Sequence, residues 1–180
     1  LASFIPDLER VITIEDTLEL RMTGKHCVAL ETRPQTIEGK GEITIRDLVR
    51  NALHMRPDRI IIGEVRGEET LDMLQCMNIG QVGSMTTMHA NSSLDALLRL
   101  ETMAMMGGSK VSGELVRRQI ISAIDIVITA DRLPDGTRRV VAISEVEKNR
   151  PEYALKDIYA LVKAQGQAQA ELRLGGDTNV

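Results

Sequence analysis

Short runs of β-branched apolar residues alternate along this chain with longer segments whose apolar residues recur at helical spacing. Residues 11–14 and 60–62 are the clearest runs, and residues 28–30 form a shorter one. Segments 45–53 and 71–79 carry apolar side chains three or four positions apart, which is typical of helices with one buried face. This alternation of strands and helices predicts an α/β fold with a mainly parallel central sheet flanked by helices.

Polar residues and glycines mark where the helices begin and end. Residues 44–47 have the pattern of a capping box, and Gly80 is suited to end the second helix. A third helix is predicted after Asn91 or Ser92, either of which can cap it, and a fourth after Ser112.

Two further strands are predicted toward the C-terminus. Residues 126–128 and 140–143 are apolar runs that flank a turn sequence at 134–137. We therefore expect an antiparallel hairpin that closes a mixed sheet.

The last part of the chain has a weaker pattern. Residues 1–147 are expected to form one partial domain, and residues 148–180 a tail of uncertain structure. Within that tail, 153–162 fits either a helix or a strand, and 175–177 is expected to be disordered.

Composition narrows the class of protein. Hydrophobic residues make up 43% of the 180 residues but aromatic ones only 2%, so the core must be aliphatic, which favours an α/β architecture over an aromatic-rich β-sandwich. The formal net charge of -4 gives no overall attraction for nucleic acid or for an anionic membrane.

Cys27 and Cys76 form no metal-binding pattern and are read as small buried side chains in a reducing compartment. Without a long apolar run or a signal peptide, the chain is predicted to be cytoplasmic.

Two carboxylates follow the strongest strand patterns. Glu15 comes directly after 11–14, and Glu64 follows 60–62 by two positions. Because parallel strands end at one edge of a sheet, where open α/β folds place their ligands, both carboxylates should lie there and serve phosphate chemistry with a metal. The alternative is that each is a solvated residue where a strand meets a loop.

His89 ends the segment 83–89, which contains a short strand-like run with Thr86 and Thr87. This position at a strand end favours a functional histidine, although a structural histidine bonded to a neighbouring backbone group is the alternative.

Arginines cluster between and beside the two carboxylate strands, and they suit phosphate binding through paired donors. For those on the helix 45–53, the alternative is a face of salt bridges. The arginines are Arg33, Arg46, Arg50, Arg56, Arg59 and Arg66.

Two catalytic patterns are missing from the 180 residues. No G-x-x-x-x-G-K-[ST] loop, which would cradle phosphates, occurs, and no G-x-S-x-G elbow supports a catalytic triad.

Several segments together resemble the type II/IV secretion system ATPase superfamily, in particular the CpaF-like branch that drives tight-adherence pili. Residues 12–16 resemble its aspartate box, residues 60–66 its Walker B motif and residues 83–91 its histidine box. Residues 32–34, 39–44 and 55–59 are also similar to family sequence. The resemblance covers roughly residues 1–147.

This resemblance implies a RecA-like ATPase domain that uses ATP and magnesium. Glu64 would polarise the attacking water and act with magnesium, Glu15 would help to arrange the metal shell, and His89 would link the phosphate state to movement. Candidate phosphate contacts, within or across a subunit boundary, would be Arg56, Arg33 and Arg46.

The resemblance also implies a homo-oligomer, in particular a hexameric ring, at the inner face of the bacterial inner membrane. Its partners would be platform proteins of a secretion or pilus system, with no direct nucleic-acid contact. In the family the phosphate-binding loop precedes the aspartate box, so this chain alone is expected to hydrolyse ATP negligibly. The alternatives are a non-hydrolysing ring or interaction subunit and, with less support, a DNA-translocating RecA-like ATPase.

Overall fold

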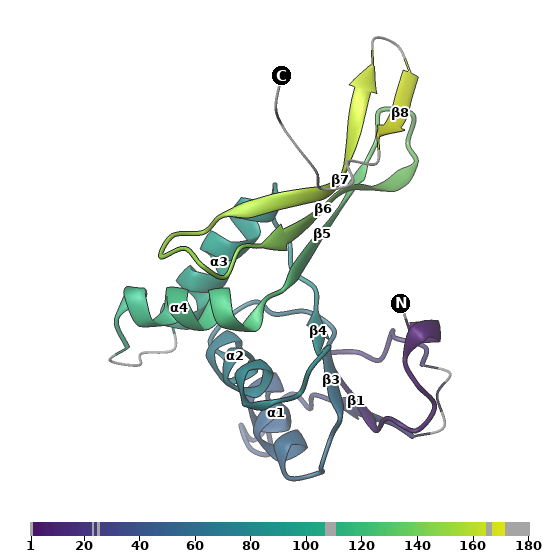
Figure 1. Ribbon diagram of the computed structural model, residues 1–180. Helices are drawn as coiled ribbons and strands as arrows, with labels where there is room; N and C mark the ends of the chain where they lie inside the picture. The colour runs from purple at the N-terminus through teal and green to yellow at the C-terminus, as the bar shows by residue number, and fades with distance from the viewer. Residues whose placement is uncertain (1, 23, 25, 107–110, 165–166, 172–180) are drawn as a thin grey trace.

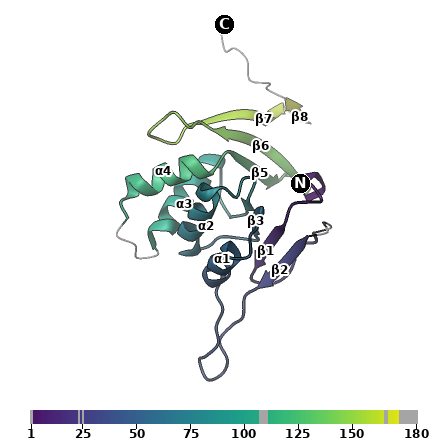
Figure 2. The same cartoon turned by 60° about the horizontal axis from the view of Figure 1, so that its bottom comes forward.

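The computed structural model describes residues 2–22, 24, 26–106, 111–164 and 167–171 (Figure 1). The chain forms two sheets of four strands each in its described part. In Figure 2 strands of the antiparallel sheet lie above the helices α3 (Ser93–Met106) and α4 (Gly113–Ala123), and the parallel strands lie at the lower right, beside the other helices. No helix in the described part of the chain has the length and hydropathy needed to span a bilayer.

The parallel sheet has the order β2-β1-β3-β4. Its strands are β1 (Val11–Glu15), β2 (Cys27–Glu31), β3 (Arg59–Ile62) and the two-residue β4 (Met85–Thr86), and every pairing between them is parallel. All five residues of β1 are buried, as expected for an inner strand covered on both faces.

One aliphatic core joins the parallel sheet to the helices. The short 3-10 helix η1 (Ala2–Phe4) is followed by α1 (Ile45–Leu53), α2 (Glu69–Ile79), α3 (Ser93–Met106) and α4 (Gly113–Ala123). The core includes the following side chains from strands and helices: Ile12, Ile14, Ile60, Ile62, Val49, Leu74, Leu97, Val116 and Ile120.

The helix boundaries follow the predicted caps. Thr44 accepts a hydrogen bond from the backbone N–H of Asp47, whose carboxylate in turn accepts one from the backbone of Thr44, so the capping box is confirmed. Gly80 has a φ of 124°, which suits glycine at the end of α2. Ser112 caps α4.

The second sheet is antiparallel and has the order β5-β6-β7-β8. It contains β5 (Ile126–Arg132), β6 (Arg138–Val146), β7 (Leu155–Ala164) and β8 (Gln167–Glu171).

The central parallel sheet with its helices confirms the predicted α/β class. The predicted hairpin is also present as β5 and β6, but it belongs to the second sheet, so the expectation that it closes the parallel sheet is wrong for the described residues.

Strand β4, at the edge of the parallel sheet, has only two residues and offers little backbone for pairing. The ambiguous segment 153–162 lies largely in β7, and residues 175–177 are outside the described residues. The division at residue 147 stays a prediction.

A buried polar cluster connects the start of α3 to the antiparallel sheet. The Oγ of Ser144 lies 3.1 Å from the Oγ of Ser93 and 2.7 Å from a carboxylate oxygen of Asp157. Ser93 also lies 2.9 Å from the hydroxyl of Thr129 on β5. Because α3 begins four residues after His89, this cluster fixes the second sheet relative to the segment that carries the histidine.

Candidate functional site

Strands β1 and β3 end side by side, so the loops that follow them lie at the same edge of the parallel sheet. The backbone N–H of Gly63 donates to the carbonyl of Ile14 over 2.8 Å, which extends the pairing beyond β3. The loop after β4 is joined to the same edge, because the hydroxyl of Thr87 donates to the carbonyl of Gly63 and the N–H of Val65 donates to the carbonyl of Thr87. Three strand ends therefore present their side chains together.

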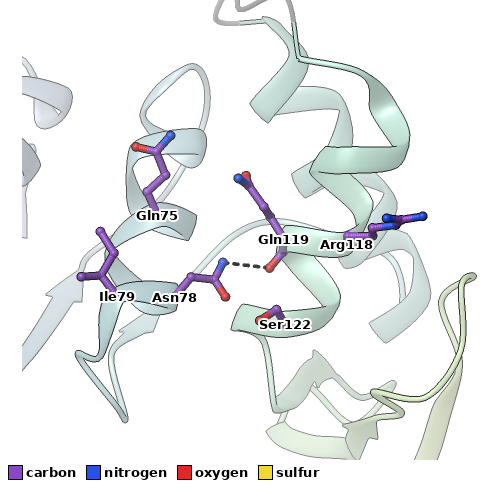
Figure 3. A pocket seen from close by; sticks show the side chains of 6 residues that line it. All are labelled: Gln75, Asn78, Ile79, Arg118, Gln119 and Ser122. Carbon is purple, nitrogen blue, oxygen red and sulfur yellow. Dashed lines mark hydrogen bonds between the residues drawn. The ribbon is translucent and has the colours of Figure 1, made fainter.

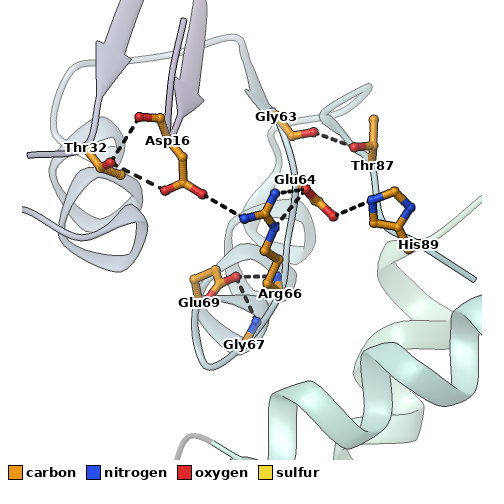
Figure 4. A network of polar contacts seen from close by, with 9 residues as sticks. All are labelled: Asp16, Thr32, Gly63, Glu64, Arg66, Gly67, Glu69, Thr87 and His89. Atoms are coloured by element: carbon orange, nitrogen blue, oxygen red, sulfur yellow. Dashed lines mark hydrogen bonds and ion pairs between the residues drawn. The ribbon is translucent and has the colours of Figure 1, made fainter. Parts of the chain in front are cut away.

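Glu64 occupies the centre of this edge (Figure 4). One carboxylate oxygen lies 3.2 Å from Nε2 of His89, and the other accepts a 2.8 Å hydrogen bond from Nε of Arg66. The hydrogen bond from Arg66 lowers the pKa of Glu64, so the carboxylate is ionised at neutral pH. The structure thus brings Glu64 and His89, two of the predicted site residues, into direct contact.

Arg66 extends the cluster toward the end of β1. Its guanidinium lies 3.7 Å from a carboxylate oxygen of Asp16, and the hydroxyl of Thr32 is bonded to the backbone of Asp16. Figure 4 shows Arg66 between the Asp16 and Glu64 carboxylates. The result is a chain of alternating charges along the carboxyl edge of the sheet.

Glu15 is nearby but turned inward, with only 3% of its surface exposed. One carboxylate oxygen accepts hydrogen bonds from the backbone N–H groups of Glu19 and Leu20, at 3.0 and 2.9 Å, and so holds the loop after β1. The other oxygen is buried and has no hydrogen-bond partner in the described part of the chain. A Cβ on Gly63 would lie 3.0 Å from Cγ of Glu15, so a glycine there lets the two strand ends approach.

Arg33 and Arg46 are engaged elsewhere. Arg33 follows β2 at the same edge of the sheet, but its Nε donates to the carbonyl of Gly41 over 2.7 Å within its own loop. Arg46 binds Glu68 and Asp72 of α2, each at 2.8 Å. Arg50 shares Asp72 at 2.9 Å, so these two arginines of α1 form the salt-bridged helix face that was the alternative interpretation.

Arg56 lies at the other end of β3. It precedes that strand, whereas Glu64 follows it, and its backbone has the positive φ of 53° that few residues other than glycine adopt. Among the described residues, no hydrogen bond or ion pair joins Arg33, Arg46 or Arg56 to Glu64.

The carboxylates suit magnesium only in part. Magnesium prefers oxygen ligands and is usually held by one or two carboxylates together with phosphate and water. The described residues contain no group of three or more His, Cys, Asp or Glu side chains placed to hold a metal ion. The unpartnered oxygen of Glu15 is buried, and of the two carboxylates only Glu64 lines the hollow described below.

A small hollow of about 180 Å³ opens beside Glu64. Its polar lining consists of Glu64, Arg66, His89 and Arg99, and Met88 and Met103 contribute apolar surface. A larger hollow of about 450 Å³ lies between α2 and α4 (Figure 3), where the side-chain amide of Asn78 donates to the carbonyl of Gln119. That hollow has no carboxylate in its lining and sits at the far end of α2 from Glu64, about 16 Å along an 11-residue helix.

The sequence matches the family model of type II/IV secretion system proteins over residues 1–170. The chain belongs to this family. It is 39% identical to a putative conjugal transfer protein of Mycobacterium tuberculosis over 144 residues, which is 80% of this chain and 40% of that protein. It is 34% identical to the type IV secretion system protein VirB11 of Bartonella henselae, over 79% of this chain and 40% of the relative. The chain therefore spans about two fifths of the length of these relatives.

Solved structures of the family agree with this fold. The VirB11 ATPase from the Brucella suis type IV secretion system superposes with a TM-score of 0.69 at 31% identity, covering 78% of this chain and 41% of that one. The ATPase DotB of Legionella pneumophila shares the fold with a TM-score of 0.52 at 23% identity, over 78% and 37% of the two chains. The predicted superfamily is thus confirmed.

The sequence placed Arg66 among the arginines suited to phosphate binding, but it gave no individual role to Asp16 or Arg99. Asp16 could have been found, because it stands next to the predicted carboxylate Glu15. Arg99 gave no such signal, because it lies in the middle of α3 and reaches the hollow only through the packing of that helix.

Proposed function

We propose that this chain is the catalytic part of an ATPase that couples ATP hydrolysis to pilus assembly or protein secretion, in the CpaF-like branch of its family. Membership of the type II/IV secretion family supports the reaction class. The observation that carries the proposal is the contact between an ionised Glu64 and His89 at the carboxyl edge of the parallel sheet.

Glu64 has the charge and position to act on the attacking water. A general base must be ionised and within hydrogen-bond reach of the proton it accepts. Glu64 is ionised at neutral pH, the hydrogen bond from Arg66 lowers its pKa further, and the carboxylate borders the hollow. His89 is 91% exposed at its side chain, so it is free to exchange Glu64 for a phosphate oxygen when a ligand enters. That exchange would link the phosphate state to the helix α3 that follows His89.

Bound ATP would bring magnesium, which neutralises phosphate charge in reactions of this class. Glu15 and Glu64 would contribute to the outer shell of that ion. Of Arg33, Arg46 and Arg56, only Arg56 has a side chain without a hydrogen bond or ion pair to a described residue, so it is the candidate for a phosphate contact across a subunit boundary. Arg33 would first have to release Gly41, and Arg46 would have to leave two carboxylates.

The active assembly in this proposal is a homohexameric ring at the cytoplasmic face of the inner membrane, in contact with platform proteins. The structure offers apolar side chains for such contacts. Phe4 and Leu8 are 86% and 89% exposed, and Ile37 projects fully at the tip of the loop that Arg33 closes.

The proposal is tested by the release of phosphate from ATP. We expect turnover of about 1 per second or more in a form of the protein that includes a G-x-x-x-x-G-K-[ST] loop, and negligible turnover in the 180-residue chain alone. Glu64→Gln should abolish most of the activity of the longer form. Full activity of that variant would refute the assigned role.

An interaction subunit without hydrolysis is the second candidate, because the 180 residues contain no phosphate-binding loop motif. It would assemble in a concentration-dependent manner, as measured by analytical ultracentrifugation, and would show no turnover in any form of the protein.

A further inference from the structure

Arg99 is a cation in the hollow beside Glu64 that no described residue neutralises. The other charged groups there are already paired, because Glu64 binds both Arg66 and His89, and Arg66 also lies near Asp16. Arg99 lines the same hollow and has no hydrogen bond or ion pair to any described residue. An arginine cannot lose its charge near neutral pH, so this positive charge persists.

The helix that carries Arg99 does not supply a partner either. Charged side chains on a helix usually pair with residues three or four positions away. Four positions before Arg99, Asp95 instead accepts hydrogen bonds from the backbone and side-chain amides of Asn91, at 2.8 and 3.1 Å. Four positions after it stands Met103, which is apolar and 7% exposed. No ion pair therefore joins the Arg99 side chain to a carboxylate in the described part of α3.

The size of the hollow limits what can fill it. Pockets for whole organic ligands usually have about 300 to 1,000 Å³, whereas this hollow has about 180 Å³. At about 30 Å³ per water molecule it holds about six waters, which is room for one phosphate group but not for a nucleotide. Arginine recognises phosphate oxygens through two parallel N–H donors.

We propose that Arg99 binds a phosphate group in this hollow, which His89 and Glu64 also line. The inference rests on the proposed function for the source of that phosphate, which is the terminal phosphate of ATP before hydrolysis and inorganic phosphate after it. Arg99 then holds the terminal phosphoryl group that is transferred to water, while ADP is the leaving group. The change in phosphate charge acts on α3 through the Arg99 side chain.

Inorganic phosphate binding to the 180-residue chain tests the site without hydrolysis. The Nε–H signal of Arg99 in a ¹H–¹⁵N spectrum should move as phosphate is added, and Arg99→Gln should weaken binding about tenfold. Arg99→Lys, which keeps the charge but not the paired donors, should fall between the two. Arg138→Gln is the matched control, because Arg138 is an exposed arginine on β6, outside this hollow. Equal phosphate affinity in the Arg99→Gln and Arg138→Gln variants would overturn the inference.

A second measurement separates this inference from the proposed function. In an ATP-hydrolysing form of the protein, Arg99→Gln should lower kcat/KM for ATP about tenfold and reduce inhibition by added phosphate. Hydrolysis with unchanged kcat, KM and phosphate inhibition would remove the role of Arg99 and leave the ATPase proposal intact. If phosphate binds at Arg99 but no form of the protein hydrolyses ATP, the phosphate site at Arg99 stands and the ATPase proposal is refuted.

Discussion

Strand β1 of the parallel sheet is buried along its whole length, whereas β5 of the antiparallel sheet leaves every second apolar side chain partly open, as at Ile126 and Ile128. The candidate site lies at the ends of the buried strands. Strands that are covered on both faces place the side chains that follow them rigidly, and a catalytic arrangement needs such precision. The antiparallel sheet is held mainly through its contacts with the helix layer, so it can follow a movement of that layer.

Removing the charge of one carboxylate should have very different effects in the two sheets. Glu64→Gln should lower ATP turnover about 100- to 10,000-fold in a form of the protein that hydrolyses ATP, because an amide cannot accept the proton of the attacking water. Glu145→Gln, at an exposed position on β6, should leave turnover within about twofold. Phosphate release under saturating ATP measures the turnover of both variants. Similar losses in the two variants would contradict the assignment of the catalytic carboxylate to the end of the parallel strands.

The two sheets should also differ in how much one isoleucine contributes to the free energy of unfolding. Ile62 in β3 is 1% exposed and Ile128 in β5 is 45% exposed. Ile62→Ala should lower the free energy of unfolding by about 2 to 5 kcal/mol, because it leaves a cavity in the core. Ile128→Ala should cost less than about 1 kcal/mol. Urea unfolding of both variants measures the difference, and equal losses would contradict the contrast in burial.

A buried polar cluster joins the start of α3 to the antiparallel sheet, and its contribution to stability can be measured. Ser144 is fully buried, and Ser144→Ala would leave Ser93 and Asp157 without their shared partner. We expect a loss of about 1 to 2 kcal/mol in the free energy of unfolding. Ser122→Ala, at an exposed position on α4, is the control and should be nearly neutral. If both variants unfold at the same urea concentration, the buried cluster does not hold the sheet to α3.

The two regions also differ in how well the sequence predicts them. Strands β1 and β3 were predictable because buried strands are nearly continuous apolar runs; Glu15 ends β1, and Glu64 follows β3 by two positions. The pairing of β5 and β6 was predictable from their turn. Their membership of a second sheet was not, because a strand pattern shows that a strand exists but does not show which edge it joins.

The candidate site was predictable only where the backbone determines position. Glu64 and His89 follow strands, so their contact could be expected from the topology. The partners of Arg46 could not, because a long side chain reaches in several directions and its carboxylates come from α2, more than 20 residues away. The cluster of Ser93 and Ser144 joins residues 51 positions apart, and no local pattern indicates it.

The smallest expected effect is a change in the titration of Glu64, which tests how the charges at the sheet edge are arranged. The hydrogen bond from Arg66 lowers the pKa of Glu64, and the nearby charges of Arg66 and His89 act in the same direction. A carboxyl group whose pKa is lower in the folded state contributes stability above its unfolded pKa, and that contribution is lost as the pH falls through the folded pKa. Arg66→Gln should therefore raise the pKa of Glu64 toward its ordinary value and reduce stability slightly at neutral pH but not in strong acid. Carboxyl ¹³C signals followed against pH measure this shift, and an unchanged midpoint would contradict Arg66 as the main cause of the lowered pKa of Glu64.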